Sequence, residues 1–146
     1  MLPSITVKQV LRRKGHGYWA VPPTATAYEA LEIMADKDIG AMLVLEEGKL
    51  AGIFTERDAI FRVIAVGLDP DATPLADVMT KDPTTITPDK TFGHAMLMMH
   101  EGGFRHVPVV EDGKLVGMVS SRNALDPDLE EFVFEEHRRK RLLETR

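Results

Sequence analysis

Apolar residues recur along the chain with two different spacings, and each spacing occurs twice. In residues 27–34 and again in residues 92–99, apolar side chains stand three or four positions apart, which is the spacing of an amphipathic helix. A short extended piece precedes each helix, at residues 18–21 and 84–87, and prolines mark a turn between the two. The pattern therefore predicts the same strand, turn and helix in both halves of the chain.

Each predicted helix is followed by apolar runs of strand length, at residues 41–45 and 107–110. Each run leads to an acidic residue and a glycine, Glu47-Gly48 and Asp112-Gly113, which favour the tight turn of a β-hairpin. The returning strands are predicted at residues 50–54 and 115–119, and a second helix is predicted after each of them. The predicted order of elements is β-α-β-β-α in each half.

The two halves are copies of one unit. Gly48 and Gly113 are 65 residues apart, and this offset aligns residues 21–59 with the second half without a gap. Upstream, residues 7–11 resemble residues 75–79 at an offset of 68, so a three-residue difference falls in the polar stretch near Lys14, where a loop can absorb it. Register kept over such a length indicates a duplication.

We expect a mixed α+β (α/β) fold in which the two copies face each other and bury each other's apolar surface. The expected boundaries are residues 7–64 for the first unit, 65–74 for a linker, 75–125 for the second unit and 126–146 for a helical tail. Asp126-Pro127 is typical of a helix start, with Asp at the cap and Pro at the first position. The apolar side chains of the tail need a partner surface, which is either the same chain or a second copy.

Composition narrows the function. The chain has 146 residues, a formal net charge of -5 and no cysteine, which excludes disulfides, thiol catalysis and metal sites that use cysteine. An acidic chain is a poor partner for nucleic acid, and the basic cluster at residues 138–141 follows several glutamates on the same predicted helix. No apolar run approaches the roughly 20 residues that span a bilayer. We expect a protein of the cytoplasm that binds neither nucleic acid nor membrane.

The chemistry is concentrated where the last strand of each copy meets the helix after it. The first copy has Thr55, Arg57 and Asp58 there, and the second has Ser120, Arg122 and Asn123 at the equivalent positions. A hydroxyl before a helix start can bond a phosphate oxygen, since the helix dipole favours an anion there. A carboxylate one turn later can accept hydrogens from a ribose diol, and the arginines add compensating charge.

The same residue types have a structural interpretation. Thr55 and Ser120 can act as helix N-caps, and Asp58 can complete a capping arrangement with Thr55. Recurrence of the pattern in both copies, each time after a glycine that permits close approach, favours a ligand site over a cap alone.

The chain resembles the CBS domain family over roughly residues 7–125. The resemblance is carried by the tandem duplication and by the strand at residues 105–110. It is also carried by a seven-residue motif at the end of each copy, which has Gly first, an apolar residue second, Thr or Ser fourth and, in the family, Asp seventh. It implies a pseudo-twofold disc with two clefts, each able to hold an adenosine-containing ligand: AMP, ADP, ATP, NAD or S-adenosylmethionine. It also implies pairing into a flat homodimer.

By position, the resemblance implies that Asp58 holds a ribose and Thr55 a phosphate, with adenine between apolar walls near Ala20, Ile39 and Met42. The second cleft would use Thr85 beside the base, Ser120 at the phosphate and the main chain near Val107. Phosphates near the centre would be met by Arg105, His106 and Arg122, with Arg57 adding charge in the first copy.

Asn123 departs from the family pattern, which has Asp at this position. A neutral amide offers one acceptor oxygen and no charge, so the second cleft should bind about tenfold more weakly or stay empty. In the first copy, Gly40-Ala41 stands where the second has Arg105-His106, so its cations must come from the other half.

Other functions have less support. His94 and His100 are six positions apart, which does not place two metal ligands on one helix face, and we expect no metal. No nucleophile and base pattern indicates an enzyme. The expected function is a non-catalytic regulatory module that binds an adenine nucleotide and acts on an unidentified client. The alternative is a dimeric scaffold with vestigial clefts.

Overall fold

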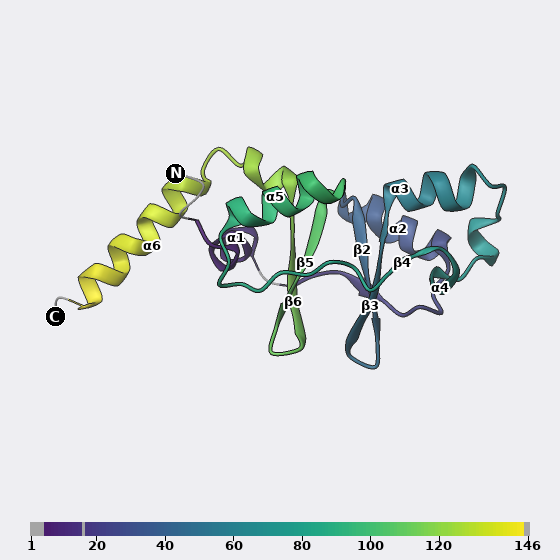
Figure 1. Cartoon of the computed structure of the whole chain (residues 1–146), viewed down its shortest axis with the longest axis horizontal. Helices are drawn as coiled ribbons and strands as arrows, with labels where there is room; N and C mark the ends of the chain where they lie inside the picture. Colours follow the sequence, from purple (N-terminus) through teal and green to yellow (C-terminus); the bar gives the residue numbers. More distant parts are fainter. Residues whose placement is uncertain (1–4, 16, 145–146) are drawn as a thin grey trace. The chain divides into compact units, whose positions relative to one another are not determined.

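A computed structural model describes residues 5–15 and 17–144, and these fall into two compact units (Figure 1). Unit 1 contains the described residues of Met1–Gly17, Thr85–Glu111 and Val116–Arg146. Unit 2 contains Tyr18–Thr84 and Asp112–Leu115. Both units mix helices with strands, which confirms the predicted mixed α/β class.

Unit 2 is built on a four-stranded sheet in the order β1-β2-β3-β4. Its strands are β1 (Ala20–Val21), β2 (Ala41–Glu46), β3 (Lys49–Thr55) and β4 (Thr80–Lys81). Its helical elements are α2 (Ala27–Lys37), α3 (Glu56–Asp58), the π-helix η2 (Ala59–Ile64), the 3-10 helix η3 (Pro70–Ala72) and α4 (Leu75–Val78). Strand β1 runs parallel to β2, and the other pairs are antiparallel.

Unit 1 repeats this plan on the hairpin of β5 (His106–Glu111) and β6 (Lys114–Ser120), apart from residues 112–115 at its tip. Its helical elements are α1 (Val7–Lys14), α5 (Phe92–Gly102), the 3-10 helix η4 (Ser121–Leu125) and α6 (Leu129–Glu144). The predicted first strand of this copy is reduced to a single parallel bridge between Ile86 and Val109.

Both predicted hairpin turns are present. Glu47 and Gly48 have φ angles of 53° and 78°, and Asp112 and Gly113 have nearly the same values, 52° and 78°. Two successive residues with positive φ form the tight turn whose twist matches that of the flanking strands. The acidic residue and glycine identified in each copy therefore set the register of the strands on either side.

Each unit combines one repeat with the segment that precedes the other repeat. In unit 1 the Val7 N–H donates to the Lys90 carbonyl (2.8 Å), and Thr6 forms a bridge with Thr91. In unit 2 the Ala27 N–H donates to the Thr73 carbonyl (2.8 Å) at the equivalent bridge. Helix α1 is thus packed with the second repeat and α4 with the first, so neither compact unit is continuous in sequence.

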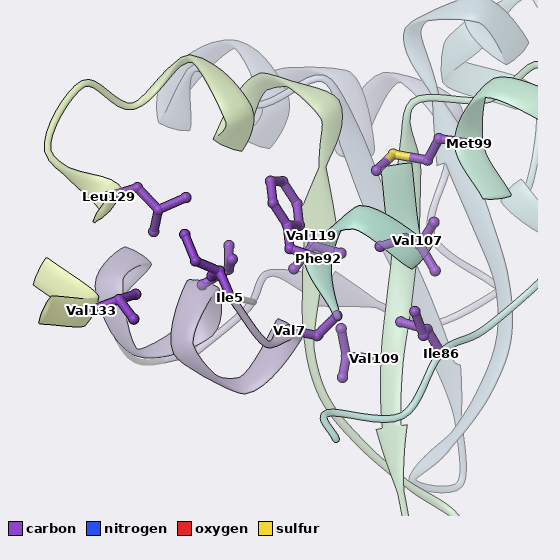
Figure 2. Packing of buried hydrophobic residues seen from close by; sticks show 12 residues of the cluster. Ile5, Val7, Ile86, Phe92, Met99, Val107, Val109, Val119, Leu129 and Val133 are labelled. Carbon is purple, nitrogen blue, oxygen red and sulfur yellow. The ribbon is translucent and has the colours of Figure 1, made fainter. Parts of the chain in front are cut away.

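Each unit has its own apolar core. In unit 2, Phe54 and Met42 of the sheet pack with the helical residues Ala30, Met34 and Val63. In unit 1, the core extends from the hairpin to Ile5 and to the first turns of α6. Figure 2 shows Ile5, Leu129 and Val133 on one side of this cluster and Met99, Val107 and Ile86 on the other. The helical spacing of apolar residues predicted these inward faces.

The copies differ after their last strand. In the first copy α3 continues into η2, whereas in the second the predicted helix is present only as the short 3-10 helix η4. The reason is Asp126-Pro127, which stands where the first copy has Phe61-Arg62: proline lacks an N–H and disfavours helical geometry in the residue before it. Helix α6 also begins at Leu129, two residues later than predicted.

Candidate functional site

The strand–helix junction of unit 2 is organised around Thr55 and Asp58. The Asp58 N–H donates to Thr55 Oγ1 (3.2 Å), and the Thr55 N–H donates to Asp58 Oδ2 (3.0 Å). The Thr55 hydroxyl donates to the same carboxylate oxygen (3.2 Å). This is a complete capping box, in which both side chains satisfy main-chain N–H groups at the helix start. The structural role of the pair is therefore present.

The other carboxylate oxygen of Asp58 has longer contacts. The Thr80 hydroxyl donates to Oδ1 over 3.4 Å, and Arg62 Nε lies 3.5 Å from the same atom. The Asp58 side chain is only 9% exposed, whereas that of Arg62 is 52% exposed. An ionised carboxylate has acceptor capacity on both oxygens, and contacts beyond about 3.2 Å are weak. Oδ2 is thus committed to the cap, while Oδ1 is held only loosely.

Unit 1 has the same junction with a different side chain. The Ser120 N–H donates to Asn123 Oδ1 over 2.8 Å, as the Thr55 N–H does to the Asp58 carboxylate. The Ser121 N–H donates to the Arg105 carbonyl (3.0 Å), and at the equivalent place in unit 2 the Glu56 N–H donates to the Gly40 carbonyl (3.1 Å). Asn123 has one side-chain oxygen, which already caps the junction and carries no charge, whereas Asp58 has a second carboxylate oxygen outside the cap.

Three basic side chains gather at this end of the β5–β6 hairpin. Lys14, the last residue of α1, donates from Nζ to the Met118 carbonyl over 2.6 Å. Burial, followed by the charges of Lys14 and Arg105, lowers the pKa of His106 from its usual 6.5 to about 4. Burial also lowers the pKa of the Lys14 ammonium, although much of this residue is exposed. The fold thus holds His106 neutral beside two cations.

Lys14 is the site residue that the sequence interpretation missed, since it lies in the stretch where the two copies lose register. Because the offset changes there from 68 to 65, the repeat assigns this cation no equivalent residue in the other copy. Among ion pairs of the described residues, none involves Lys14 or Arg105. Among the described residues, Lys14 and Arg105 thus lie at this end of unit 1 without a carboxylate at ion-pair distance.

The remaining predicted residues are placed as follows: Ala20 and Ile39 are half-buried in unit 2, Thr85 and Arg122 are exposed in unit 1, and Arg57 is exposed in unit 2. The side chains of Met42 and Val107 lie in the cores of their units, so only their main-chain atoms can face a ligand. The expected place of Met42 near the adenine stays a prediction from the sequence. The Arg57 guanidinium lies 5.0 Å from the centre of the Phe61 ring.

Residues 5–15 and 17–144 lack two other kinds of site. This part of the chain contains no group of three or more His, Asp or Glu side chains placed to hold a metal ion. No helix in it combines the length and the apolar character that crossing a bilayer requires.

Comparison with known proteins gives the same family on sequence and on structure. The sequence model of the CBS domain family matches residues 7–65 and again residues 75–128. A mitochondrial CBS domain-containing protein of Arabidopsis thaliana, CBSX3, is 36% identical over 126 residues, which are 80% of this chain and 61% of that protein. The chain spans less than two thirds of the length of the curated relatives it matches.

Solved structures agree with this. A CBS-domain containing protein from Agrobacterium tumefaciens is 35% identical, with a TM-score of 0.77 over 82% of this chain and 96% of that chain. A CBS domain protein from Pyrobaculum aerophilum, solved as a complex with AMP, is 26% identical, with a TM-score of 0.75 over 90% of this chain and 97% of that chain. With both copies matched and the fold shared, this chain belongs to the CBS domain family and carries two CBS domains.

Proposed function

We propose that the chain is a non-catalytic regulatory module that binds an adenosine-containing ligand, such as AMP, ADP, ATP, NAD or S-adenosylmethionine. The family and the AMP complex of the Pyrobaculum aerophilum relative support the ligand class. A ligand of this kind acts as a signal only if it binds two arrangements of the protein with different affinity.

The observation that carries the proposal is the positive charge at the end of the β5–β6 hairpin. Lys14 and Arg105 lie near enough to His106 to depress its pKa, and neither takes part in an ion pair among the described residues. A phosphate placed here would relieve the repulsion among these groups and accept charge-assisted hydrogen bonds from them.

Asp58 is proposed to bind the sugar through Oδ1. Its weak contacts with Thr80 and Arg62 can be exchanged for the hydroxyls of a ribose, while Oδ2 keeps the helix cap. Asn123 offers only the uncharged oxygen that already caps its junction, so this junction would bind a ribose less tightly. Arg57, Arg122, Thr85 and the apolar residues Ala20 and Ile39 remain proposed ligand contacts.

Isothermal titration calorimetry with the five ligands tests the proposal on wild type, Lys14→Gln and Asp58→Asn. Lys14→Gln should weaken a phosphate-bearing ligand about tenfold and leave adenosine itself unchanged. Lys8→Gln is the matched control, because Lys8 is exposed at the other end of α1. Absence of binding by all five ligands, or equal effects of the two lysine substitutions, would contradict the proposal.

A dimeric scaffold is the second candidate, and one observation favours it: the capping box already occupies Thr55 and one oxygen of Asp58. Homodimer formation is compatible with both candidates.

Ile60, Phe61 and Ile64 are 55%, 57% and 60% exposed on η2, which is unusual for large apolar residues and suits a protein contact. The client and the cytoplasmic location remain predictions from the sequence.

A further inference from the structure

Arg62 lies beside the carboxylate oxygen of Asp58 that is proposed to bind the sugar. It stands four residues after Asp58, and its Nε lies 3.5 Å from Asp58 Oδ1. Its Nη1 donates to the Met79 carbonyl over 3.1 Å. Arg62 belongs to η2, a π-helix, and helices of this kind are rare and are found frequently at functional sites. The guanidinium therefore joins the carboxylate of Asp58 to the end of α4, which packs against η2.

The end of α4 supplies both contacts of Asp58 Oδ1. Met79 holds the guanidinium of Arg62 through its main-chain carbonyl, and the next residue, Thr80, donates its hydroxyl to Oδ1 over 3.4 Å. Met79 is 8% exposed, and its own N–H donates to the Leu75 carbonyl at the C-cap of α4. The position of the Met79 carbonyl is thus fixed by the fold. Arg62 is tethered near Oδ1 by a hydrogen bond that a ligand at Asp58 does not need to break.

A buried carboxylate needs a partner when no ligand is bound. The Asp58 side chain is only 9% exposed, and burial of an unpaired charge is costly. Oδ2 is used by the helix cap, so the charge at Oδ1 is met by Thr80 and Arg62. Both contacts are long and therefore weak. This geometry suits a partner that stabilises the charge of Asp58 and still yields to a stronger hydrogen-bond donor.

The second copy has neither member of this pair. At the offset of 65, Asn123 takes the place of Asp58 and Pro127 takes the place of Arg62. A neutral amide carries no charge that needs a cation beside it. The chain therefore has the carboxylate and the arginine together in one copy and both replaced in the other.

We propose that Arg62 is a resting partner of Asp58, which competes with the ligand sugar and so sets the affinity of this site. The proposal rests on the nucleotide function proposed above and adds a residue that regulates it. When a ribose hydroxyl donates to Oδ1, the contact with Arg62 is lost, while the hydrogen bond from Arg62 to the Met79 carbonyl stays. Because the Arg62 side chain is 52% exposed, its pair with Asp58 is weak, and the competition lowers the affinity about threefold.

Calorimetric titration of adenosine into wild type, Arg62→Met and Lys49→Met tests the competition. Adenosine has the sugar without a phosphate, so removal of a cation does not weaken its attraction to the protein through net charge. Arg62→Met should bind adenosine about threefold more tightly than wild type, whereas loss of a ligand contact would weaken binding. Lys49→Met is the matched control, because it removes the same charge from the exposed start of β3, at the opposite end of the strand from Thr55. It should bind adenosine as wild type does.

Salt dependence gives a second readout, which a change in folding would not produce. Added salt screens the pair between Arg62 and Asp58, so it should tighten the binding of adenosine to wild type. Arg62→Met has no such pair, and its affinity should change less with salt. Arg62→Lys keeps the charge and should follow the salt dependence of wild type.

The outcomes separate this proposal from the nucleotide function. Equal adenosine affinity in wild type and Arg62→Met, or weaker binding by the variant, would overturn the role of Arg62 and leave the nucleotide function in place. A loss of affinity confined to AMP would assign Arg62 to the phosphate and would overturn the proposal as well. Failure of wild type to bind adenosine would contradict the sugar contact of Asp58 on which the competition depends. Failure to bind any of the five nucleotide ligands would contradict the nucleotide function itself.

Discussion

Replacing Asp58 separates its structural role from its proposed role at a ligand. In Asp58→Ala the Thr55 N–H loses its acceptor, and the Thr80 hydroxyl and Arg62 lose their contacts with the same carboxylate. Loss of a helix cap costs about 1 kcal/mol, and buried polar groups left without a partner add about as much again. Asp58→Ala should therefore lower the free energy of unfolding by about 2 kcal/mol.

Asp58→Asn is the matched variant, because the chain itself uses asparagine at the equivalent position. Asn123 caps the Ser120 N–H over 2.8 Å, so an asparagine at position 58 can keep the hydrogen bond to the Thr55 N–H. We expect a loss of about 0.5 kcal/mol, from the weakened interaction with the partly exposed Arg62.

Differential scanning calorimetry measures this difference. For a chain of this length, 1 kcal/mol corresponds to about 3 °C, so Asp58→Ala should lower Tm by about 6 °C and Asp58→Asn by 1 to 2 °C. Both variants should weaken binding of the adenosine ligand, because both remove the charged acceptor Oδ1. An equal loss of Tm in the two variants would refute the capping argument. Full ligand affinity in Asp58→Asn would refute the proposed sugar contact.

Gly52→Ala should lower the free energy of unfolding by about 2 kcal/mol, because the added Cβ would lie 2.7 Å from a main-chain oxygen. In Gly117→Ala the added Cβ would meet only the movable end of the Leu11 side chain at 2.8 Å, so urea unfolding should show less than half of this loss. The pKa of His106 in the folded protein is about 4, below its usual 6.5, so wild type should lose up to about 3 kcal/mol of stability as pH falls from 6.5 to 4. The stability of His106→Gln should change less with pH over this interval, and parallel stability curves for the two proteins would contradict the assignment. Asn123→Asp should strengthen the weaker ligand site about tenfold in calorimetry, and an unchanged isotherm would remove this residue from the site.

The sequence by itself determined the local structure and the duplication. Glu47-Gly48 and Asp112-Gly113 predict hairpin turns because few other residue pairs adopt two successive positive φ angles, and both turns are present. The apolar spacing predicts α2 and α5 because a buried helix face requires it. Pro127 also carried enough information to predict that the last helix of the second copy is interrupted, although the repeat suggested otherwise.

Only the tertiary structure decided which distant segments share a core and which side chains meet. The N-terminal helix α1 packs with the second repeat and α4 with the first, and this brings Lys14 to the strand that contains Met118. Sequence spacing carries no signal for such a contact, because two segments about a hundred residues apart are joined only by packing. The same holds for His106, whose pKa depends on burial and on two neighbouring cations, and for the loosely held oxygen of Asp58.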